Sequence, residues 1–113
     1  MADPNIVEVV QNYLQAIRTE GIPVSFGVLF GSQTTETSHR WSDIDLIVVS
    51  PAFDGAYPRA QKHKLWHIAG RVDNRIEPIP CGEKRWRDEA ISPIILIARR
   101  DGQVISPRIS VTE

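Results

Sequence analysis

Cysteine and methionine are almost absent from this sequence, and neither sign of charge predominates. The 113 residues include one cysteine and one methionine, and 13 basic against 14 acidic side chains give a formal net charge of −1. A lone thiol, Cys81, excludes an internal disulfide and a zinc site built on several cysteines. The balanced charge excludes an overall basic field, so nucleic acid is not expected as a partner, although a local basic patch stays compatible with it.

Long apolar runs are missing too. The longest, Ile94–Ala98, is far shorter than the roughly 20 residues that cross a bilayer. Met1–Glu8 lacks the basic stretch and apolar core of a secretory signal. We therefore expect no membrane contact and a cytoplasmic location. A hydrophobic fraction of 42% with 24% charged residues is typical of soluble globular proteins, and the length suits one domain, residues 1–113.

Apolar periodicity predicts an alternation of helices and strands. A helix from Pro4 to about Arg18 follows the N-cap residue Asp3, and alternating apolar residues predict strands over Val24–Phe30 and Asp43–Val49. The polar segment Gly31–Ser42 between these strands reads as a loop. Two helices and two strands follow: a helix over 59–70 with Leu65, Ile68, Ala69 and Val72 on its inner face, a strand over 75–80, a helix from Ser92 with Ile94, Ile95, Ile97 and Ala98 inward, and a short strand at Val104 and Ile105. Because Pro78 and Pro80 lack an N–H, the strand over 75–80 is expected either at an edge of the sheet or with these two positions facing solvent. This order predicts an α/β (α+β) fold, a small mixed β-sheet packed with helices.

Acidic residues open the second predicted strand. Asp43 and Asp45 are two residues apart, so they project from the same face, where their charges repel unless a cation neutralises them. Paired carboxylates on a strand suit Mg²⁺, which takes its other ligands from phosphates and water. Gly31 lets the backbone approach a phosphate, and Ser32 adds a hydroxyl and an N–H.

Two other phosphate or metal motifs do not fit this segment. An EF-hand loop would need a further oxygen ligand at position 47, which is Ile47. A P-loop would need a lysine, and Gly31–Ser42 has none.

The segment Gly27–Val49 resembles the signature of the DNA polymerase β-like nucleotidyltransferase superfamily, and most of all its minimal nucleotidyltransferases. The shared pattern is an apolar strand that ends in Gly31-Ser32, a gap of about ten residues, and Ser42-Asp43-Ile44-Asp45 at the start of a strand. The likeness extends over nearly the whole chain, because residues 75–80 are similar to the strand that brings the third acid, here Glu77.

This resemblance implies a polymerase β-like nucleotidyltransferase fold and the Mg²⁺-dependent transfer of a nucleoside monophosphate, with AMP from ATP as the expected group. The implied catalytic residues, which would also hold two Mg²⁺ ions, are Asp43, Asp45 and Glu77. The implied nucleotide-binding residues are Gly31, Ser32 and Ser42. Minimal family members are paired with helical HEPN toxins, so the resemblance also implies a HEPN partner, a tyrosine acceptor and an antitoxin role.

Two departures from the family pattern leave other functions open. Thr35-Glu36 stands where many relatives carry Arg-Gly, and Glu77 stands where Asp is commoner. The first alternative is therefore a catalytically weak or inactive nucleotide-binding antitoxin that neutralises its partner by contact. A small-molecule nucleotidyltransferase is the second, although the chain has no room for a second domain. The sequence is also compatible with a homo-oligomer.

Several conspicuous side chains have a structural interpretation that we prefer. His63 and His67 have zinc-chelating spacing but no evident third ligand, so a solvated helix face is the better interpretation. Trp41 and Trp86 suit an aromatic anchor at least as well as a base-stacking role. The mixed charges of Lys84–Glu89 indicate a surface segment.

Overall fold

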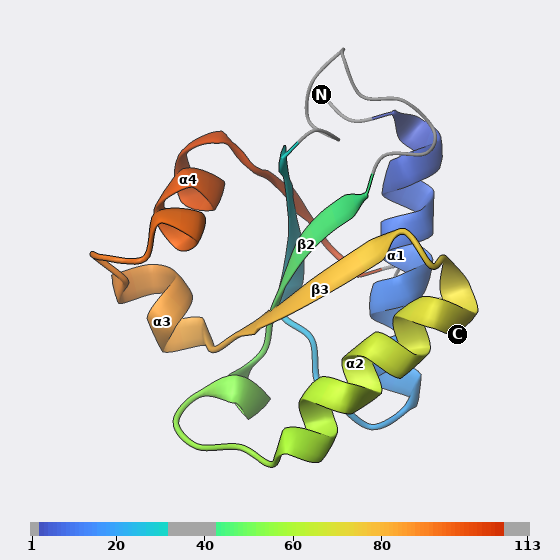
Figure 1. Cartoon of the computed structure of the whole chain (residues 1–113), viewed down its shortest axis with the longest axis horizontal. Helices are drawn as coiled ribbons and strands as arrows, with labels where there is room; N and C mark the ends of the chain where they lie inside the picture. The colour runs from blue at the N-terminus through green and yellow to red at the C-terminus, as the bar shows by residue number, and fades with distance from the viewer. Residues whose placement is uncertain (1–2, 32–42, 108–113) are drawn as a thin grey trace, which may run out of the picture.

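A computed structural model of the chain describes residues 3–31 and 43–107 and has a four-stranded sheet of order β3-β2-β1-β4 at its centre (Figure 1). The strands are β1 (Phe26–Phe30), β2 (Ile44–Val49), β3 (Ile76–Cys81) and β4 (Gln103–Ile105). The helices are α1 (Pro4–Thr19), α2 (Arg59–Val72), α3 (Glu83–Asp88) and α4 (Pro93–Asp101), with a 3₁₀ turn, η2, at Pro51–Phe53. β2 and β3 are parallel, and β1 is antiparallel to both β2 and β4. The predicted mixed sheet packed with helices is confirmed.

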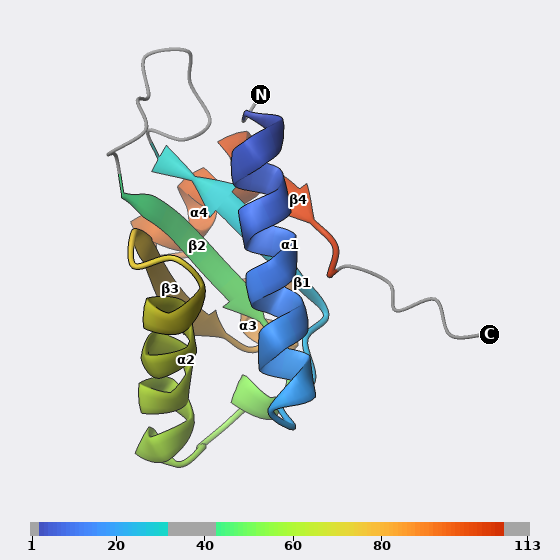
Figure 2. The same ribbon diagram turned by 90° about the vertical axis from the view of Figure 1, so that its right-hand side faces the viewer.

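Helices cover both faces of the sheet, in two separate apolar clusters. α1 and α2 lie over one face, and α3 and α4 lie over the other (Figures 1 and 2). Because side chains alternate along a strand, Leu46 and Val48 of β2 pack under α1 and α2, whereas Ile47 and Val49 pack under α3 and α4. By the same alternation Asp45 belongs to the face that carries α3 and α4.

α1 begins as its sequence predicts. The Asp3 side chain accepts a hydrogen bond from the backbone N–H of Asn5 at 2.7 Å, and proline occupies the first turn. The apolar stripe of α1 is buried, and the Tyr13 hydroxyl inside it donates to the carbonyl of Leu65 in α2 at 2.8 Å. Burial raises the pKa of Tyr13, so the phenol stays protonated and fixes α1 against α2.

The predicted edge strand is confirmed as β3. It lies at the end of the strand order, and it contains Pro78 and Pro80, which have no N–H to donate to a further strand. Within residues 3–31 and 43–107, no helix combines the length and the apolar character needed to cross a membrane.

Two predicted helix faces are partly wrong. In α4 only Ile95 and Ala98 are buried, whereas Ile94 and Ile97 are each 47% exposed. A short helix that rests on the sheet through two residues one turn apart buries a narrow stripe, so apolar content alone overestimates its inner face. In α2 the expected inner residue Val72 ends the helix and is 36% exposed.

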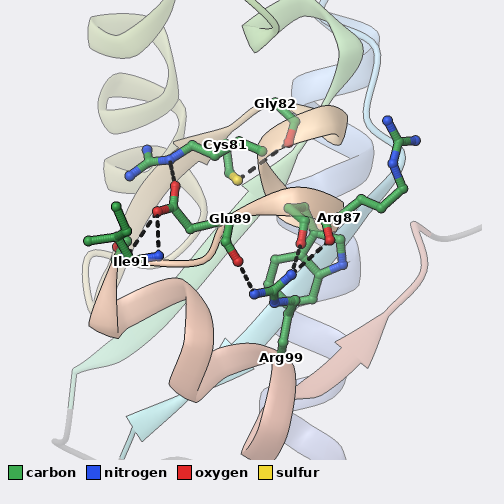
Figure 3. A network of polar contacts seen from close by, with 9 residues as sticks. Cys81, Gly82, Arg87, Glu89, Ile91 and Arg99 are labelled. Carbon is green, nitrogen blue, oxygen red and sulfur yellow. Dashed lines mark hydrogen bonds and ion pairs between the residues drawn. The ribbon is translucent and has the colours of Figure 1, made fainter.

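α3 was not predicted, because its six residues have no apolar stripe and long-range contacts hold it. Its Trp86 packs edge-on against Phe26 of β1, with ring centroids 5.9 Å apart. The Arg99 guanidinium of α4 donates to the carbonyls of Trp86, Arg87 and Glu89, which satisfies carbonyls at the end of α3 (Figure 3).

The Glu89 carboxylate completes this connection between α3 and α4. It accepts from Arg85 Nε at 2.9 Å and from the backbone N–H groups of Ser92 and Ile91 (Figure 3). These hydrogen bonds, that of Arg85 first, lower the pKa of Glu89 to about 2. The two helices are therefore joined by charged groups that the sequence presents only as a mixed surface run.

Candidate active site

Three chain segments that are distant in the sequence meet where the ends of three neighbouring strands lie side by side. β1 ends there, whereas the parallel strands β2 and β3 begin there, and the register places Phe30 opposite Asp45 and Asp45 opposite Glu77. Neighbouring strands lie roughly 4.8 Å apart, so Asp45 and Glu77 project side by side from the face that also carries α3 and α4. The structure thus brings together acids that the sequence places on separate elements.

Asp43, the residue immediately before β2, lies beside these two acids. It is exposed, and it forms a hydrogen bond with Glu77, which is the largest cause of the raised pKa of Glu77. Burial and the charges of Asp43 and Asp45 raise that pKa further. For Asp45, burial comes first and the charge of Asp43 second, and both raise its pKa.

The cluster of Asp43, Asp45 and Glu77, here called the acid cluster, places three carboxyl groups together, and their environment raises the pKa values of Asp45 and Glu77. A divalent cation would supply the positive charge that offsets the repulsion between these groups. Oxygen ligands of this kind suit Mg²⁺.

Gly31 brings the backbone against the acid cluster. Its φ of +79° lies in the left-handed region, and a Cβ atom at this position would lie 2.6 Å from Asp45 Oδ2. Real Cβ atoms essentially never approach an atom that closely, so any other residue here would displace the carboxylate. Glycine is thus favoured at position 31 by its left-handed backbone conformation, and a side chain there would in addition shift the Asp45 carboxylate.

The acid cluster is open. Among the described residues, no group of three or more His, Cys, Asp or Glu side chains is placed so that it could hold a metal ion by itself, and this includes Asp43, Asp45 and Glu77. Mg²⁺ is usually held by one or two carboxylates together with water and substrate phosphates, so an incomplete protein ligand set fits a metal that arrives with a nucleotide.

The remaining sequence-predicted residues divide into two groups. Ser32, Ser42 and Trp41, and the departure at Thr35-Glu36, lie outside the described residues. Cys81 is buried, and burial is the main cause of its raised thiol pKa, which fits an inert core residue.

Other predicted side chains are structural or lie elsewhere on the molecule. Trp86 is the anchor between α3 and β1, which favours the structural interpretation. His63 and His67 are exposed on α2, which covers the opposite face from the acid cluster.

Sequence reasoning missed one neighbour of the acid cluster. Phe30 is half-buried and is the register partner of Asp45, and it projects from the same face. It was assigned only to an apolar strand face. The signal was its place immediately before Gly31, at the end of the strand that delivers the backbone to the acids.

Comparison with known proteins gives a family and a fold. Residues 10–92 match the family model of the nucleotidyltransferase domain. No curated protein sequence matches the chain.

Solved structures share the fold at low sequence identity. A toxin–antitoxin complex crystallised with AMP-PNP is 22% identical with a TM-score of 0.56, and the match covers 87% of this chain and 73% of that one. A Sulfolobus solfataricus protein thought to be a nucleotidyltransferase is 12% identical with a TM-score of 0.59, covering 88% and 78%. A tri-AMPylated Shewanella oneidensis HEPN toxin in complex with its MNT antitoxin gives 15% identity and a TM-score of 0.53, covering 90% and 73%.

The family match spans the end of β1, the acids of β2 and the third acid of β3, so the predicted resemblance and the predicted polymerase β-like fold are both confirmed. The chain belongs to the nucleotidyltransferase domain family.

Proposed function

We propose that this chain transfers AMP from ATP to a hydroxyl of a protein partner, a tyrosine of a HEPN toxin, and acts as its antitoxin. The observation that carries the proposal is the acid cluster, an unfavourable arrangement of charge beside a glycine whose backbone lies against the Asp45 carboxylate. Solved structures of the same fold include a toxin–antitoxin complex with an ATP analogue and an AMPylated HEPN toxin with its antitoxin. These likenesses support the choice of nucleotide and partner.

The residues have distinct proposed roles. Asp43 and Asp45 would hold two Mg²⁺ ions. Glu77, together with Asp45, would bind one of these two ions. When bound, Mg²⁺ would neutralise the phosphates and lower the pKa of the acceptor hydroxyl. Gly31, with Ser32 and Ser42, would receive the β- and γ-phosphates through backbone N–H and hydroxyl groups.

The reaction balances as a single displacement at the α-phosphorus. The acceptor oxygen forms the new P–O bond, the bond to the bridging oxygen of the β-phosphate breaks, and pyrophosphate leaves. The acceptor proton passes through the acid cluster to solvent. The chain contributes by holding the acceptor and the leaving group in line.

An exposed apolar surface near α4 supports a protein acceptor. Five large aliphatic side chains are exposed there, and α4 lies on the same face of the sheet as the acids. Where such side chains form one contiguous patch, a partner usually covers it. The five residues are Ile91, Ile94, Leu96, Ile97 and Val104.

The test is label transfer to a co-purified HEPN partner. With Mg²⁺, label from α-labelled ATP should appear on the partner, and label from γ-labelled ATP should not. Transfer should disappear in an Asp43→Ala, Asp45→Ala double variant and persist in Asp88→Ala, a carboxylate that is 68% exposed on α3. Equal labelling by the double variant and the parent chain would refute the proposed chemistry.

A second candidate, neutralisation by contact alone, is separated by the same variants. The glutamate at position 77 motivates it, because its longer side chain alters the position of the third carboxylate. Growth rescue of cells that express the partner by the Asp43→Ala, Asp45→Ala variant would favour contact. Failure of that rescue, with intact rescue by Asp88→Ala, would favour catalysis.

A further inference from the structure

α2 carries a charge pattern unlike that of the chain as a whole. Its 14 residues contain four Lys or Arg, two His and a tryptophan, and no Asp or Glu. The whole chain has a net charge of −1. The nearly neutral net charge of the chain therefore conceals a basic helix, because acidic residues elsewhere in the sequence offset its charge.

The exposed side of α2 presents three ring side chains together. Leu65, Ile68 and Ala69 are buried on the inner side, where α2 packs against α1 and β3 (Figures 1 and 2). His63, Trp66 and His67 follow the i, i+3, i+4 spacing that places residues on one helix face, and all three are exposed. Trp66 is 47% exposed, which is a large apolar ring to leave in water.

Cations lie on both flanks of these rings. Arg59 and Lys62 are exposed, and neither forms an ion pair with any residue in the described part of the chain. On the other flank Lys64 and Arg71 pair with Glu20, the acid that also lies near His67. We call Arg59, Lys62, His63, Trp66 and His67 the ring face of α2.

A glycine extends this face where the fold itself does not need one. Gly70 lies one turn beyond Trp66, and a Cβ atom added to it would meet nothing within 4 Å. Glycine inside a helix is less stable than alanine. Gly70 leaves bare, exposed backbone beside Trp66.

We propose that the ring face of α2 binds single-stranded nucleic acid. Exposed bases stack on planar rings, including those of Trp and His, while nearby cations contact the phosphates. An acidic protein segment would use the cations but would leave the three rings unexplained, and a duplex would hide its bases from them. The proposal departs from the expectation drawn from net charge, because the relevant charge is that of one helix face.

The test measures binding of a fluorescein-labelled U12 RNA by fluorescence anisotropy at about 50 mM salt. EDTA is present and nucleotide is absent, so the result does not depend on the acid cluster. Trp66→Ala should weaken binding about 5- to 100-fold, and Trp66→Phe, which keeps a ring, should recover most of the affinity. Thermal melts of each variant confirm that it is folded.

Matched charge reversals separate this face from general electrostatics. Arg59→Glu with Lys62→Glu should reduce the salt slope of binding by about 1.4, as for two lost phosphate contacts on a single strand. Lys84→Glu with Arg87→Glu changes the net charge equally on α3 and should leave the slope nearly unchanged. A labelled dodecaglutamate peptide and a 12-base-pair RNA duplex serve as competing ligand classes.

Each outcome decides the proposal. Binding of U12 that is lost through the ring-face variants and retained by the α3 variant supports it. Absence of U12 binding, equal loss in both charge reversals, or binding of dodecaglutamate as tight as that of U12 would overturn it, the last in favour of an acidic protein ligand. Duplex binding as tight as single-strand binding would also overturn it, because base stacking would then contribute nothing.

Discussion

The contact between Gly31 and Asp45 provides the sharpest test of the site. Gly31→Ala would place a methyl group 2.6 Å from Asp45 Oδ2, in a backbone conformation with φ of +79°. Gly21→Ala is the matched control, because Gly21 has φ of +98° and nothing lies within 4 Å of an added Cβ. Both variants carry backbone strain, but only the first disturbs a carboxylate.

The expected losses of stability and activity follow from the backbone strain and from the displacement of the carboxylate. The unfavourable φ should lower the free energy of unfolding of each variant by about 1–2 kcal/mol, and Tm by roughly 5–10 °C. In Gly31→Ala the carboxylate must also retreat by about 0.8 Å to restore an ordinary 3.4 Å contact. A displacement of about 1 Å in a catalytic group costs on the order of 10²-fold in rate.

The assay compares thermal melts with label transfer from α-labelled ATP and with Mg²⁺-dependent ATP binding by calorimetry. Similar Tm losses in both variants, together with a loss of transfer of about 10²-fold in Gly31→Ala only, would agree with the structure. Full activity of Gly31→Ala despite its lower Tm would show that the position of Asp45 does not matter, and the proposed site would be wrong.

Three further predictions concern stability. Tyr13→Phe removes the buried hydrogen bond to Leu65 and should lower the free energy of unfolding by about 1 kcal/mol in urea titrations; no change would mean that water replaces the hydroxyl. Because the pKa of Glu89 is about 2 in the folded chain and near 4.5 unfolded, its stabilising effect is complete above pH 4.5 and is lost as pH falls toward 2, so Glu89→Gln should flatten that part of a Tm–pH profile. The raised pKa of Asp45 acts in the opposite direction, since stability is lost as pH rises through it. Asp45→Asn should therefore raise Tm at pH 8 in EDTA, and Mg²⁺ should reduce the difference in Tm between the variant and the parent chain. A lower Tm would contradict the cost of burying this charge beside Asp43.

The elements with local signals were predictable from the sequence. Asp3-Pro4 and a regular apolar stripe fix the start of α1, and Pro78 with Pro80 marks β3 as an edge strand. Gly102 closes α4 without a left-handed conformation, because its backbone φ is −76°. Glycine is needed at position 102 because of packing, since a Cβ atom there would meet the carbonyl of Ala98 at 2.5 Å.

Elements held by long-range contacts were not predictable. α3 depends on Arg99, which lies beyond it in the chain, and on a ring contact with β1. The inner face of α4 was overestimated because the sheet offers it only a narrow contact, and no pattern within Pro93–Asp101 records that limit. Such facts belong to the packed molecule, and local periodicity carries no information about them.

The acid cluster lies between these two cases. Asp43 and Asp45 share a strand, so spacing alone places them together, but only resemblance to a family pointed to Glu77 as the third acid. Its convergence depends on the parallel register that sets Asp45 opposite Glu77. A slip of one residue in β3 would turn Glu77 toward α1 and α2 and leave an apolar side chain beside the aspartates. That slip is unfavourable because it would move the charged Glu77 side chain into the apolar cluster under α1 and α2, so the core that stabilises β3 also positions the third carboxylate.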